Sequence, residues 1–463
     1  MVRLVVGPGP AGGDRRAAGV TGPFWLADTG AEWTDEPSVV AGHRLDRSGV
    51  QPHGSPLAVA FPRGVEQVRE VVRGAYATRT PIVTRGAGTA LTGASTAGEG
   101  VIVLDLSRMD RIREIRADDG VAVTEPGVIT AQLDRAAAAH GLRYAPDPAS
   151  LEISTIGGNI ATNAGGLRCA KYGVTRDAVL GLDVVLADGR LIRTGRATLK
   201  GVAGYDLTGL FVGSEGTLGV IVGATLRLRP LPEPTTTIAA SYGAVADAAA
   251  ASVALAGARI QPVLAELLDE ATLDAIDADQ GTHLRKAASA LLIVQIDGGA
   301  AEAARALEVL GTDATDVRST ADPAETAALL AARRGALPAI ERLGRPLIED
   351  IAVPRSRLAE AVREIGAIAR RYDITICTLA HAGDGNLHPI IVADETMVAA
   401  TAAADEIFAL ALRLGGTVTG EHGVGVLKRA WLRRELGPDN HDLQRQLKSL
   451  FDPYGLLNPG KAL

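Results

Sequence analysis

The 463-residue sequence contains little cysteine, few aromatic residues and no long apolar run. Its two cysteines, Cys169 and Cys377, lie far apart and form no CxxC or cluster-binding spacing, which excludes a bound iron–sulfur centre and a disulfide framework. Aromatic residues make up 3% of the chain and the formal net charge is −7, so the sequence offers neither base-stacking platforms nor a phosphate-neutralising surface. We therefore expect no nucleic-acid partner.

No apolar run approaches the length of a membrane span, and the N-terminus lacks a basic segment followed by an apolar one. Together with the scarcity of cysteine, this favours a protein of the reducing cytoplasm, either free or peripherally attached at the inner face of the membrane. With 47% apolar and 22% charged residues, the chain can bury a large core and divide into two or three domains.

A glycine pattern near the start of the chain has the wrong surroundings for a nucleotide site. Gly7-Pro-Gly-Pro-Ala-Gly12 satisfies GxGxxG, which places a pyrophosphate at a helix N-terminus only when a helix follows directly. Here the chain reaches Gly19 and then Pro23 before any helical pattern develops. The pattern is more typical of a flexible glycine- and proline-rich leader, which we extend over residues 1–35.

From residue 56 the sequence alternates between helical and strand patterns. Val65, Val68 and Val72 recur at helical spacing, and the helix ends before Pro81, where a buried strand begins. Asp188-Gly189 between two apolar runs predicts a tight hairpin. The other expected elements are strands at 81–84, 101–106 and 121–123, a helix over 130–140, and hairpin strands at 182–186 and 190–193.

Three prolines between residues 228 and 234 mark a domain boundary. Beyond it, apolar strands at 291–296, 347–353 and 374–379 alternate with alanine-rich helices, which predicts an antiparallel sheet carrying helices on one face. The expected fold class is α+β. We expect a first unit of two α+β subdomains over 36–232, a second unit over 233–424, and a helical C-terminal segment over 425–463.

Four segments concentrate glycine with small hydroxyl or amide residues, at 85–93, 154–159, 163–166 and 213–219. Successive glycines let backbone N–H groups converge on an anion, so each segment is a candidate phosphate cradle. One such segment alone is more often a structural turn, but four are hard to explain as turns. Since the sequence has no GxxxxGK[ST] P-loop, a long ligand with a central diphosphate is favoured, and flavin adenine dinucleotide (FAD) leads.

Two of the eight histidines flank a tight turn in His381-Ala-Gly-Asp-Gly-Asn-Leu-His388. A hairpin there would bring both imidazoles onto neighbouring strands, and Glu421, beside His422, offers a third ligand. Two histidines and a glutamate form a known zinc set that leaves a position open for substrate. The alternative for each histidine alone is packing in a polar-lined core. A metal-dependent hydrolase would also use these residues, but it would leave the four glycine segments without a role.

The order of these motifs resembles the flavin subunit of glycolate oxidase and the FAD-linked D-lactate dehydrogenases, from residue 45 to the C-terminus. The matching segments are Thr84–Gly93, Tyr144–Pro148, Thr155–Asn159, Asn163–Gly166, Lys171–Gly173, Phe211–Gly219, His381–Asn386, Gly420–Gly425 and Asn458–Lys461. The resemblance implies the vanillyl-alcohol-oxidase and p-cresol-methylhydroxylase flavin fold. Residues 36–232 would then form a bipartite FAD-binding domain, 233–424 a substrate-cap domain, and 425–463 a segment that returns to the flavin.

In that fold the first glycine segment wraps the diphosphate, and relatives with covalent flavin often carry a histidine where this chain has Thr89. Noncovalent FAD is therefore expected. The resemblance assigns these residues to the cofactor: Arg85, Gly86, Ala87, Gly88, Thr89, Gly93, Pro146, Thr155, Gly158, Asn159, Asn163, Gly165, Ile221, Glu421 and Asn458.

Family members that act on D-2-hydroxy acids hold a divalent metal, expected here to be zinc or manganese, at the positions of His381, His388 and Glu421. The resemblance makes His422 the base for the hydroxyl proton and Arg333 the group that grips the substrate carboxylate, which a guanidinium binds bidentately. The expected catalytic residues are His422 and Arg333, and the expected substrate contacts are Arg333, His381, His388, Asn386 and His422.

Two positions depart from the relatives that oxidise D-2-hydroxyglutarate, because Ile348 replaces a lysine and Ile390 replaces an asparagine. Both changes remove contacts for a second carboxylate. They favour D-lactate or glycolate, although an apolar pocket could also take a longer 2-hydroxy acid.

The electron acceptor stays open, since a cytochrome, a quinone or a partner protein would each serve and the chain has no iron–sulfur ligands of its own. The chain could equally be the flavin subunit of a larger oxidase complex with little activity alone, and a homodimer is a further option. A third alternative is a relative of alkyl-glycerone-phosphate synthase on the same flavin fold, which has no use for net hydride acceptance.

Overall fold

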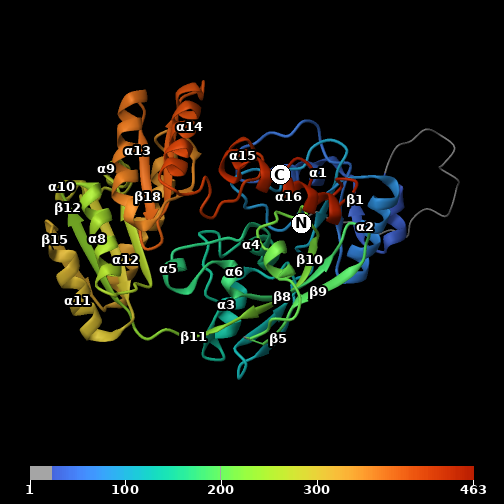
Figure 1. The fold of residues 1–463 in the computed structure, drawn as a ribbon, viewed down its shortest axis with the longest axis horizontal. Coiled ribbons are helices and arrows are strands. Elements are labelled where there is room, and N and C mark those ends of the chain that lie inside the picture. Colours follow the sequence, from blue (N-terminus) through green and yellow to red (C-terminus); the bar gives the residue numbers. More distant parts are fainter. Residues whose placement is uncertain (1–22, 199) are drawn as a thin grey trace.

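The computed structural model describes residues 23–198 and 200–463, so the Gly7–Gly12 pattern lies outside the described residues. Figure 1 shows two lobes side by side, one formed by the chain before residue 231 and the other by the strands and helices between residues 236 and 413. The helices after residue 428, drawn in red, lie on the side of the first lobe, and Trp431 in the first of them also packs against Phe408 of the second lobe.

The first lobe contains a sheet in the order β1-β2-β4-β3. Its strands are β1 (Glu32–Thr34), β2 (Ala58–Phe61), β4 (Ile102–Asp105) and β3 (Ile82–Arg85). β2, β4 and β3 are parallel, and β1 pairs antiparallel with β2 at the edge. α2 (Val65–Thr78) packs its buried valines on one face and α1 (Pro37–Gly42) lies on the other, which explains why every residue of β4 is buried. The predicted helix and strands here are confirmed.

A second, antiparallel sheet in this lobe has the order β5-β6-β10-β8-β9. Its strands are β5 (Ile112–Arg116), β6 (Val121–Thr124), β10 (Val220–Arg227), β8 (Val179–Val185) and β9 (Leu191–Gly195). β8 and β9 form the hairpin predicted from Asp188-Gly189, and α3 (Thr130–Ala138) confirms the helix expected over 130–140. The remaining elements are β7 (Leu142–Arg143), α4 (Ile156–Thr162), α5 (Cys169–Tyr172), α6 (Thr175–Ala178), α7 (Leu207–Phe211) and β11 (Arg229–Pro230).

The expectation of a flexible leader up to residue 35 is wrong for its described part. Residues Phe24–Thr29 form the 3-10 helix η2, and β1 follows directly. Leu26 is fully buried against the first sheet, with Trp25 and Trp33 packed beside it. Burial of these large apolar side chains stabilises the segment, and the glycine and proline content upstream of it gave no sign of this.

The second lobe is built on an eight-stranded sheet in the order β15-β12-β14-β13-β18-β19-β16, with the short β17 also paired to β19. All pairs are antiparallel, as predicted. The strands are β12 (Thr236–Tyr242), β13 (Leu264–Leu268), β14 (Ala290–Ile296), β15 (Asp316–Thr320), β16 (Arg345–Ile348), β17 (Ile351–Ala352), β18 (Ile376–His381) and β19 (Asn386–Ala393).

Helices cover both faces of this sheet, so the expectation of one covered face is wrong. One face packs against α8 (Val245–Gly257), α11 (Gly299–Gly311), α13 (Leu358–Tyr372) and α14 (Val398–Arg413). The other packs against α9 (Glu270–Gln280) and α12 (Pro323–Glu341). The physical reason is visible in β14, whose seven residues are all buried and apolar except Gln295, because a strand with apolar side chains on both faces needs cover on both sides. The short helices α10 (Leu284–Ala287) and η3 (Arg355–Arg357) complete the lobe.

After residue 425 the two predicted helical stretches are present as α15 (Arg429–Leu436) and α16 (Pro438–Phe451). The tail then returns to the first lobe, where Leu457 forms a parallel bridge with Ile82 of β3. The ammonium of Lys448 donates hydrogen bonds to the carbonyl oxygens of Thr217 and Leu457, at 2.7 and 2.8 Å, and so ties this helix to a glycine segment.

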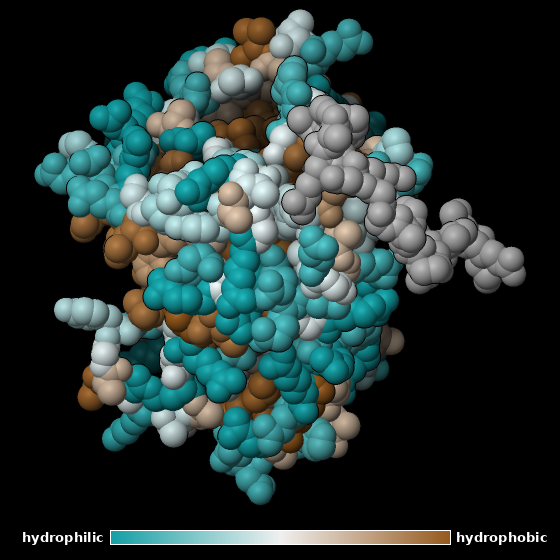
Figure 2. Space-filling view, turned by 90° about the vertical axis from the view of Figure 1, so that its right-hand side faces the viewer, coloured by the Kyte–Doolittle hydropathy of each residue, from teal (hydrophilic) through white to brown (hydrophobic). Residues whose placement is uncertain are grey.

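The surface drawn in Figure 2 is mostly hydrophilic, and its hydrophobic residues lie in small patches separated by hydrophilic ones. Scattered apolar residues of this kind are normal on a folded domain. Within residues 23–198 and 200–463, no helix is both long enough and apolar enough to cross a membrane.

Candidate active site

The turn between β18 and β19 brings the two histidines together, as predicted. In the register of this hairpin His381 lies opposite Asn386 and His388 lies opposite Leu379, so both imidazoles project from the face that α9 and α12 cover. Their ring centroids are 5.1 Å apart and both residues are buried. Gly385 has φ +89°, and an added Cβ would clash with the carbonyl oxygen of Val353, so this turn requires glycine.

Glu421 completes the expected trio. Its Oε1 atom lies 3.4 Å from Nε2 of His381 and 3.2 Å from Nε2 of His388. One ligand atom from each of the three residues lies within 4.8 Å of the others. Burial disfavours the charge of Glu421, but the two histidines outweigh it and hold the pKa of this carboxyl well below its usual range. Two imidazoles and an ionised carboxylate at this spacing fit a divalent metal and leave coordination positions free.

Glu266 lies behind His381 and was missed from the sequence. It sits in β13 directly opposite His381, and its Oε1 atom accepts a hydrogen bond from Nδ1 of His381 at 2.6 Å. Burial opposes the charge of Glu266, but His381 and Arg333 hold its pKa below the ordinary value. The same two carboxylates, Glu266 and Glu421, raise the pKa of His381 well above its ordinary value against the effect of burial.

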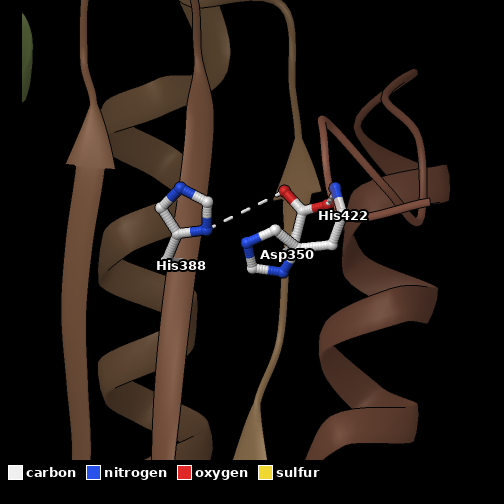
Figure 3. A group of neighbouring side chains, drawn as sticks. All are labelled: Asp350, His388 and His422. Carbon is white, nitrogen blue, oxygen red and sulfur yellow. Dashed lines mark hydrogen bonds and ion pairs between the residues drawn. The ribbon is translucent and has the colours of Figure 1, made fainter. Parts of the chain in front are cut away.

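Asp350 is a second buried carboxylate that was missed. Its Oδ2 atom accepts hydrogen bonds from the backbone nitrogens of Glu421 and His422, at 3.0 and 2.9 Å, and from the Thr419 hydroxyl at 2.8 Å. Its Oδ1 atom accepts from Nδ2 of Asn386 at 2.6 Å and faces Nδ1 of His388 at 3.9 Å. Figure 3 shows this carboxylate between the His388 ring and the backbone of His422. Asp350 therefore holds the loop that carries Glu421 and His422 against the hairpin.

His422 stacks on His388, with ring centroids 5.0 Å apart and an angle of 20° between the ring planes. Burial lowers the pKa of His422 to about 4, so the imidazole is neutral at neutral pH and able to accept a proton. Its Nδ1 atom is buried without a hydrogen-bond partner in the described part of the chain. A buried, unpartnered imidazole beside a group of side chains that could hold a metal is a candidate for a catalytic role.

The other two predicted substrate contacts lie at the same site. Arg333 on α12 donates from Nε to Oε2 of Glu266 at 2.7 Å, and its side chain is 16% exposed. Asn386 is buried and donates from Nδ2 to Asp350 and to the carbonyl oxygen of Ile351, while its Oδ1 atom has no hydrogen-bond partner among the described residues. The side-chain amide of Asn386 therefore helps to hold Asp350, which sequence reasoning did not anticipate.

The four glycine segments converge on one region. A Cβ added at Gly86 would clash with the Thr155 hydroxyl, and one at Gly165 would clash with the Glu421 carboxylate. A Cβ at Gly213 would lie 3.5 Å from Cβ of Asn163. A cavity of about 230 Å3 lies between two of these segments, 163–166 and 213–219, and the loop that carries Glu421 and His422; it is lined by residues 162–163, 176, 212–213, 215, 419–421 and 423–424. Backbone that approaches this closely, with Cβ-free positions facing inward, fits a cradle for a dinucleotide such as FAD.

Several predicted cofactor residues also shape these segments. Thr155 caps α4 by accepting from the Gly158 nitrogen at 3.2 Å. Asn159 is buried and donates to the Thr130 hydroxyl, while Asn163 has φ +51° and accepts from the Arg176 nitrogen. Arg85 is buried, and a Cβ added at Gly88 would clash with its guanidinium. Ala87, Thr89 and Gly93 complete the 85–93 turn, Pro146 lies in the buried stretch 143–148, and Ile221 is buried in β10. Their contacts with a cofactor stay a prediction.

Glu215 links the glycine segments to the loop that carries Glu421 and His422, and it was also missed. Its carboxylate accepts from the backbone nitrogens of Val424 and Gly425, at 2.6 and 2.8 Å. Its own carbonyl oxygen accepts from Nδ2 of Asn458 at 2.6 Å, and the same amide donates to the carbonyl oxygen of Ala94. One network therefore joins three regions that the resemblance assigns to the cofactor with the loop that carries Glu421 and His422.

Comparison with known proteins agrees with this geometry. Residues 231–462 match the family of FAD linked oxidases, C-terminal domain, and residues 56–195 match an FAD binding domain. The chain is 46% identical to the glycolate oxidase subunit GlcD of Bacillus subtilis, over 88% of this chain and 88% of that protein. It is 36% identical to the D-lactate dehydrogenase of Archaeoglobus fulgidus, over 93% of this chain and 99% of that protein.

Two solved structures share the fold at low sequence identity. p-Cresol methylhydroxylase is similar with a TM-score of 0.74 and 17% identity, covering 95% of each chain. 4-Ethylphenol oxidase from Gulosibacter chungangensis is similar with a TM-score of 0.72 and 19% identity, covering 93% of this chain and 94% of its own. The FAD-binding half and the cap thus have the architecture that the motif order implies. The chain belongs to the family of FAD-linked oxidases that contains the GlcD subunits and FAD-linked D-lactate dehydrogenases, with the p-cresol-methylhydroxylase type of flavin fold.

Proposed function

We propose that the protein oxidises a small D-2-hydroxy acid, D-lactate or glycolate, to the corresponding 2-oxo acid. The observation that carries this proposal is the trio His381, His388 and Glu421 with the neutral His422 stacked against it. The names of two relatives, a glycolate oxidase subunit and a D-lactate dehydrogenase, support the same substrate class.

The chemistry of a 2-hydroxy acid accounts for each proposed role. Its hydroxyl proton and the hydride on its α-carbon must leave to different acceptors. Noncovalent FAD, held by the glycine segments, would supply the hydride acceptor. His381, His388 and Glu421 would hold a divalent metal, zinc or manganese, that polarises the hydroxyl and the carboxylate of the substrate. These three residues and Asn386 would surround the α-carbon side of the substrate.

His422 would take the hydroxyl proton. A base with a pKa of about 4 is weak, but the O–H group becomes strongly acidic as hydride leaves and the carbonyl forms, so a neutral imidazole is sufficient at that moment. Arg333 would bind the substrate carboxylate through its two Nη groups, because its Nε atom is already engaged with Glu266. The products are then the 2-oxo acid, a reduced flavin and a protonated His422.

Two isoleucines, which we propose form the wall beside the substrate, favour a short substrate side chain. Ile348 and Ile390 are directly opposite each other in the β16–β19 ladder and pack in the apolar cluster that also contains part of α12. Neither can bind a second carboxylate, so a dicarboxylate would leave a charge without a partner there. A longer apolar 2-hydroxy acid is the alternative that this wall would also accept.

Anaerobic reduction of the bound flavin tests the proposal. The purified protein is mixed with D-lactate, L-lactate, glycolate or D-2-hydroxyglutarate, each with and without a metal chelator, while visible flavin absorbance is followed. We expect bleaching by D-lactate or glycolate that the chelator and His388→Ala abolish, with His140→Ala, an exposed histidine elsewhere, as the matched control. A yellow protein that no 2-hydroxy acid bleaches would refute the substrate class.

A second candidate function is the flavin subunit of a larger oxidase that needs other subunits for turnover. It is favoured by the name of the 46% identical relative, which is a subunit. This alternative predicts flavin reduction by the substrate but negligible steady-state turnover with the isolated chain and artificial dyes. A cytochrome, a quinone or a partner protein would then be the acceptor.

A further inference from the structure

Glu266 is an isolated charge in an otherwise apolar strand. It lies at the centre of Leu264–Leu268, where all five residues are buried and the neighbouring Ala265 and Leu267 belong to the apolar core. The exposed fraction of its side chain is zero. Burying a carboxylate costs several kcal/mol unless both oxygens accept hydrogen bonds, so the two contacts of Glu266 are what allow this charge to be buried.

One oxygen of Glu266 fixes the state of the metal ligand His381. A carboxylate only accepts hydrogen bonds, so the contact of 2.6 Å between Oε1 and Nδ1 requires Nδ1 to be the protonated nitrogen. The lone pair of a neutral imidazole then lies on Nε2. That is the atom that faces Glu421 and the proposed metal position.

The other oxygen fixes Arg333. Oε2 accepts from Nε at 2.7 Å, which sets the plane of the guanidinium and leaves both Nη groups as the remaining donors. Arg333 comes from α12 and His381 from β18, so neither element alone sets the distance between them. The carboxylate of Glu266 on β13 is the group that touches both.

We propose that Glu266 is a positioning residue that orients His381 for the metal and Arg333 for the substrate carboxylate at once, and thereby couples the two binding events. This inference rests on the proposed function and extends it to a residue that neither ligates the metal nor touches the substrate. Because one side chain serves both groups, a displacement caused by loss of either partner is transmitted to the other.

Glu266→Gln is the direct test. The side-chain amide keeps the volume but replaces one acceptor by an NH2 donor, which must then face either Nδ1–H of His381 or Nε–H of Arg333. Binding of Zn2+ and Mn2+ to the metal-stripped flavoprotein is measured by competition with a chromogenic chelator, without substrate. We expect affinity to fall about 10- to 100-fold, as for other groups that orient a metal-bound histidine, while the FAD content is unchanged.

Arg333→Lys supplies the test of coupling. It keeps the positive charge beside Glu266 but loses the fork, so KM for the hydroxy acid should rise, and metal affinity should also fall, by less than in Glu266→Gln, because the displaced carboxylate still contacts His381. In the Arg333→Lys background, Glu266→Gln should still weaken metal binding but should add little to KM. Additive effects on KM would contradict the coupling.

If Glu266→Gln fails to fold with its FAD, Glu266→Asp is used instead, since it keeps the charge but withdraws the carboxylate by one methylene. Unchanged metal affinity in a folded, FAD-loaded variant would overturn the proposal. A wild-type protein that binds neither Zn2+ nor Mn2+ would overturn it too. If wild type binds metal but no 2-hydroxy acid reduces its flavin, the proposed function alone falls, and the metal titration of the variant still decides the role of Glu266.

Discussion

Replacing Asp350 by asparagine should be among the most damaging single-atom changes available in this chain. Asp350 is fully buried and accepts four hydrogen bonds, from Asn386, Thr419, Glu421 and His422. An amide turns one of its two oxygens into a donor, so at least one of these N–H or O–H groups would face another donor. If the amide oxygen takes the place of Oδ2, the three hydrogen bonds from the loop that carries Glu421 and His422 survive without their charge, and the Asn386 amide faces another donor. In the other orientation the loop loses all three.

The magnitude follows from the charge as well as from the hydrogen bonds. A hydrogen bond to a charged group contributes about 1.5–3 kcal/mol. The ammonium of Lys428 is buried 3.7 Å from Oδ2 of Asp350, and removing one partner of a buried ion pair costs about 3–5 kcal/mol. Because these terms share the same atoms they do not add, and we expect Asp350→Asn to lower the free energy of unfolding by about 3–5 kcal/mol.

Urea unfolding of the FAD-loaded protein, followed by circular dichroism and by flavin fluorescence, measures this loss. Glu349→Gln is the matched control, since Glu349 is the neighbouring carboxylate, lies 3.9 Å from the same ammonium, and has its pKa raised to about 7 by burial. It should keep or gain stability. A loss for Asp350→Asn below about 1 kcal/mol, the scale of an exposed ion pair, would refute the central place given to this carboxylate.

Three further changes give independent tests. Since burial raises the folded-state pKa of Glu349 from 4.5 to about 7, the stability that its protonated form contributes is present below pH 4.5 and is lost as pH rises towards 7. Glu349→Gln should therefore match wild type near pH 4.5 and exceed it by up to about 3 kcal/mol above pH 7 in urea titrations, and a constant difference would contradict this. Ile390→Asn places an amide at the position that we propose faces the substrate side chain, so kcat/KM for D-2-hydroxyglutarate relative to D-lactate should rise about tenfold, the worth of one hydrogen bond; an unchanged ratio would remove Ile390 from the substrate site. Gly86→Ala should lower the FAD content of the purified protein because its Cβ clashes with the Thr155 hydroxyl, whereas Gly64→Ala, with no atom within 4 Å of the added Cβ, should not.

The residues that local patterns identified are those whose partners lie nearby in sequence or share a motif. The stretch between His381 and His388 predicted the hairpin because its glycines tolerate the positive φ that a tight turn requires, and Gly385 has φ +89°. Glu421 was found because it adjoins His422 between glycines. For these residues, a short stretch of sequence is enough to predict how the side chains lie relative to one another.

Glu266, Asp350 and Glu215 were missed because their contacts are made over long sequence separations. Glu266 contacts a residue 115 positions later, and Glu215 contacts a backbone nitrogen 209 positions later. Such pairs depend on which strands become neighbours in the sheet, and the local hydrophobic periodicity of the sequence does not predict that order. A signal did exist for Glu266, since an acid inside the apolar run Leu264–Leu268 requires a buried partner.

The helices on both faces of the large sheet were missed for a different reason. The four consecutive apolar residues at 291–294 predict more than a strand, because a half-exposed strand should alternate between apolar and polar residues and this stretch does not. The prediction of a flexible leader failed because glycine and proline outweighed Trp25, Leu26 and Trp33, which bury well even in a short segment. In both cases the apolar area of individual side chains decided whether the segment is buried. The average composition of the segment did not reveal it.

The bridge between Leu457 and Ile82 has a bearing on how the protein is made. The core of the first lobe includes Leu457, so that core is incomplete until almost the whole chain has left the ribosome. Contacts of such high sequence separation form slowly, because the entropy of closing a long loop is lost before the contact contributes any stability. The sheet of the cap lobe uses only residues 236–393 and its apolar core ends at Trp431, so this lobe can close earlier. Flavin is therefore expected to enter after translation, into a lobe that finishes folding last although it was synthesised first.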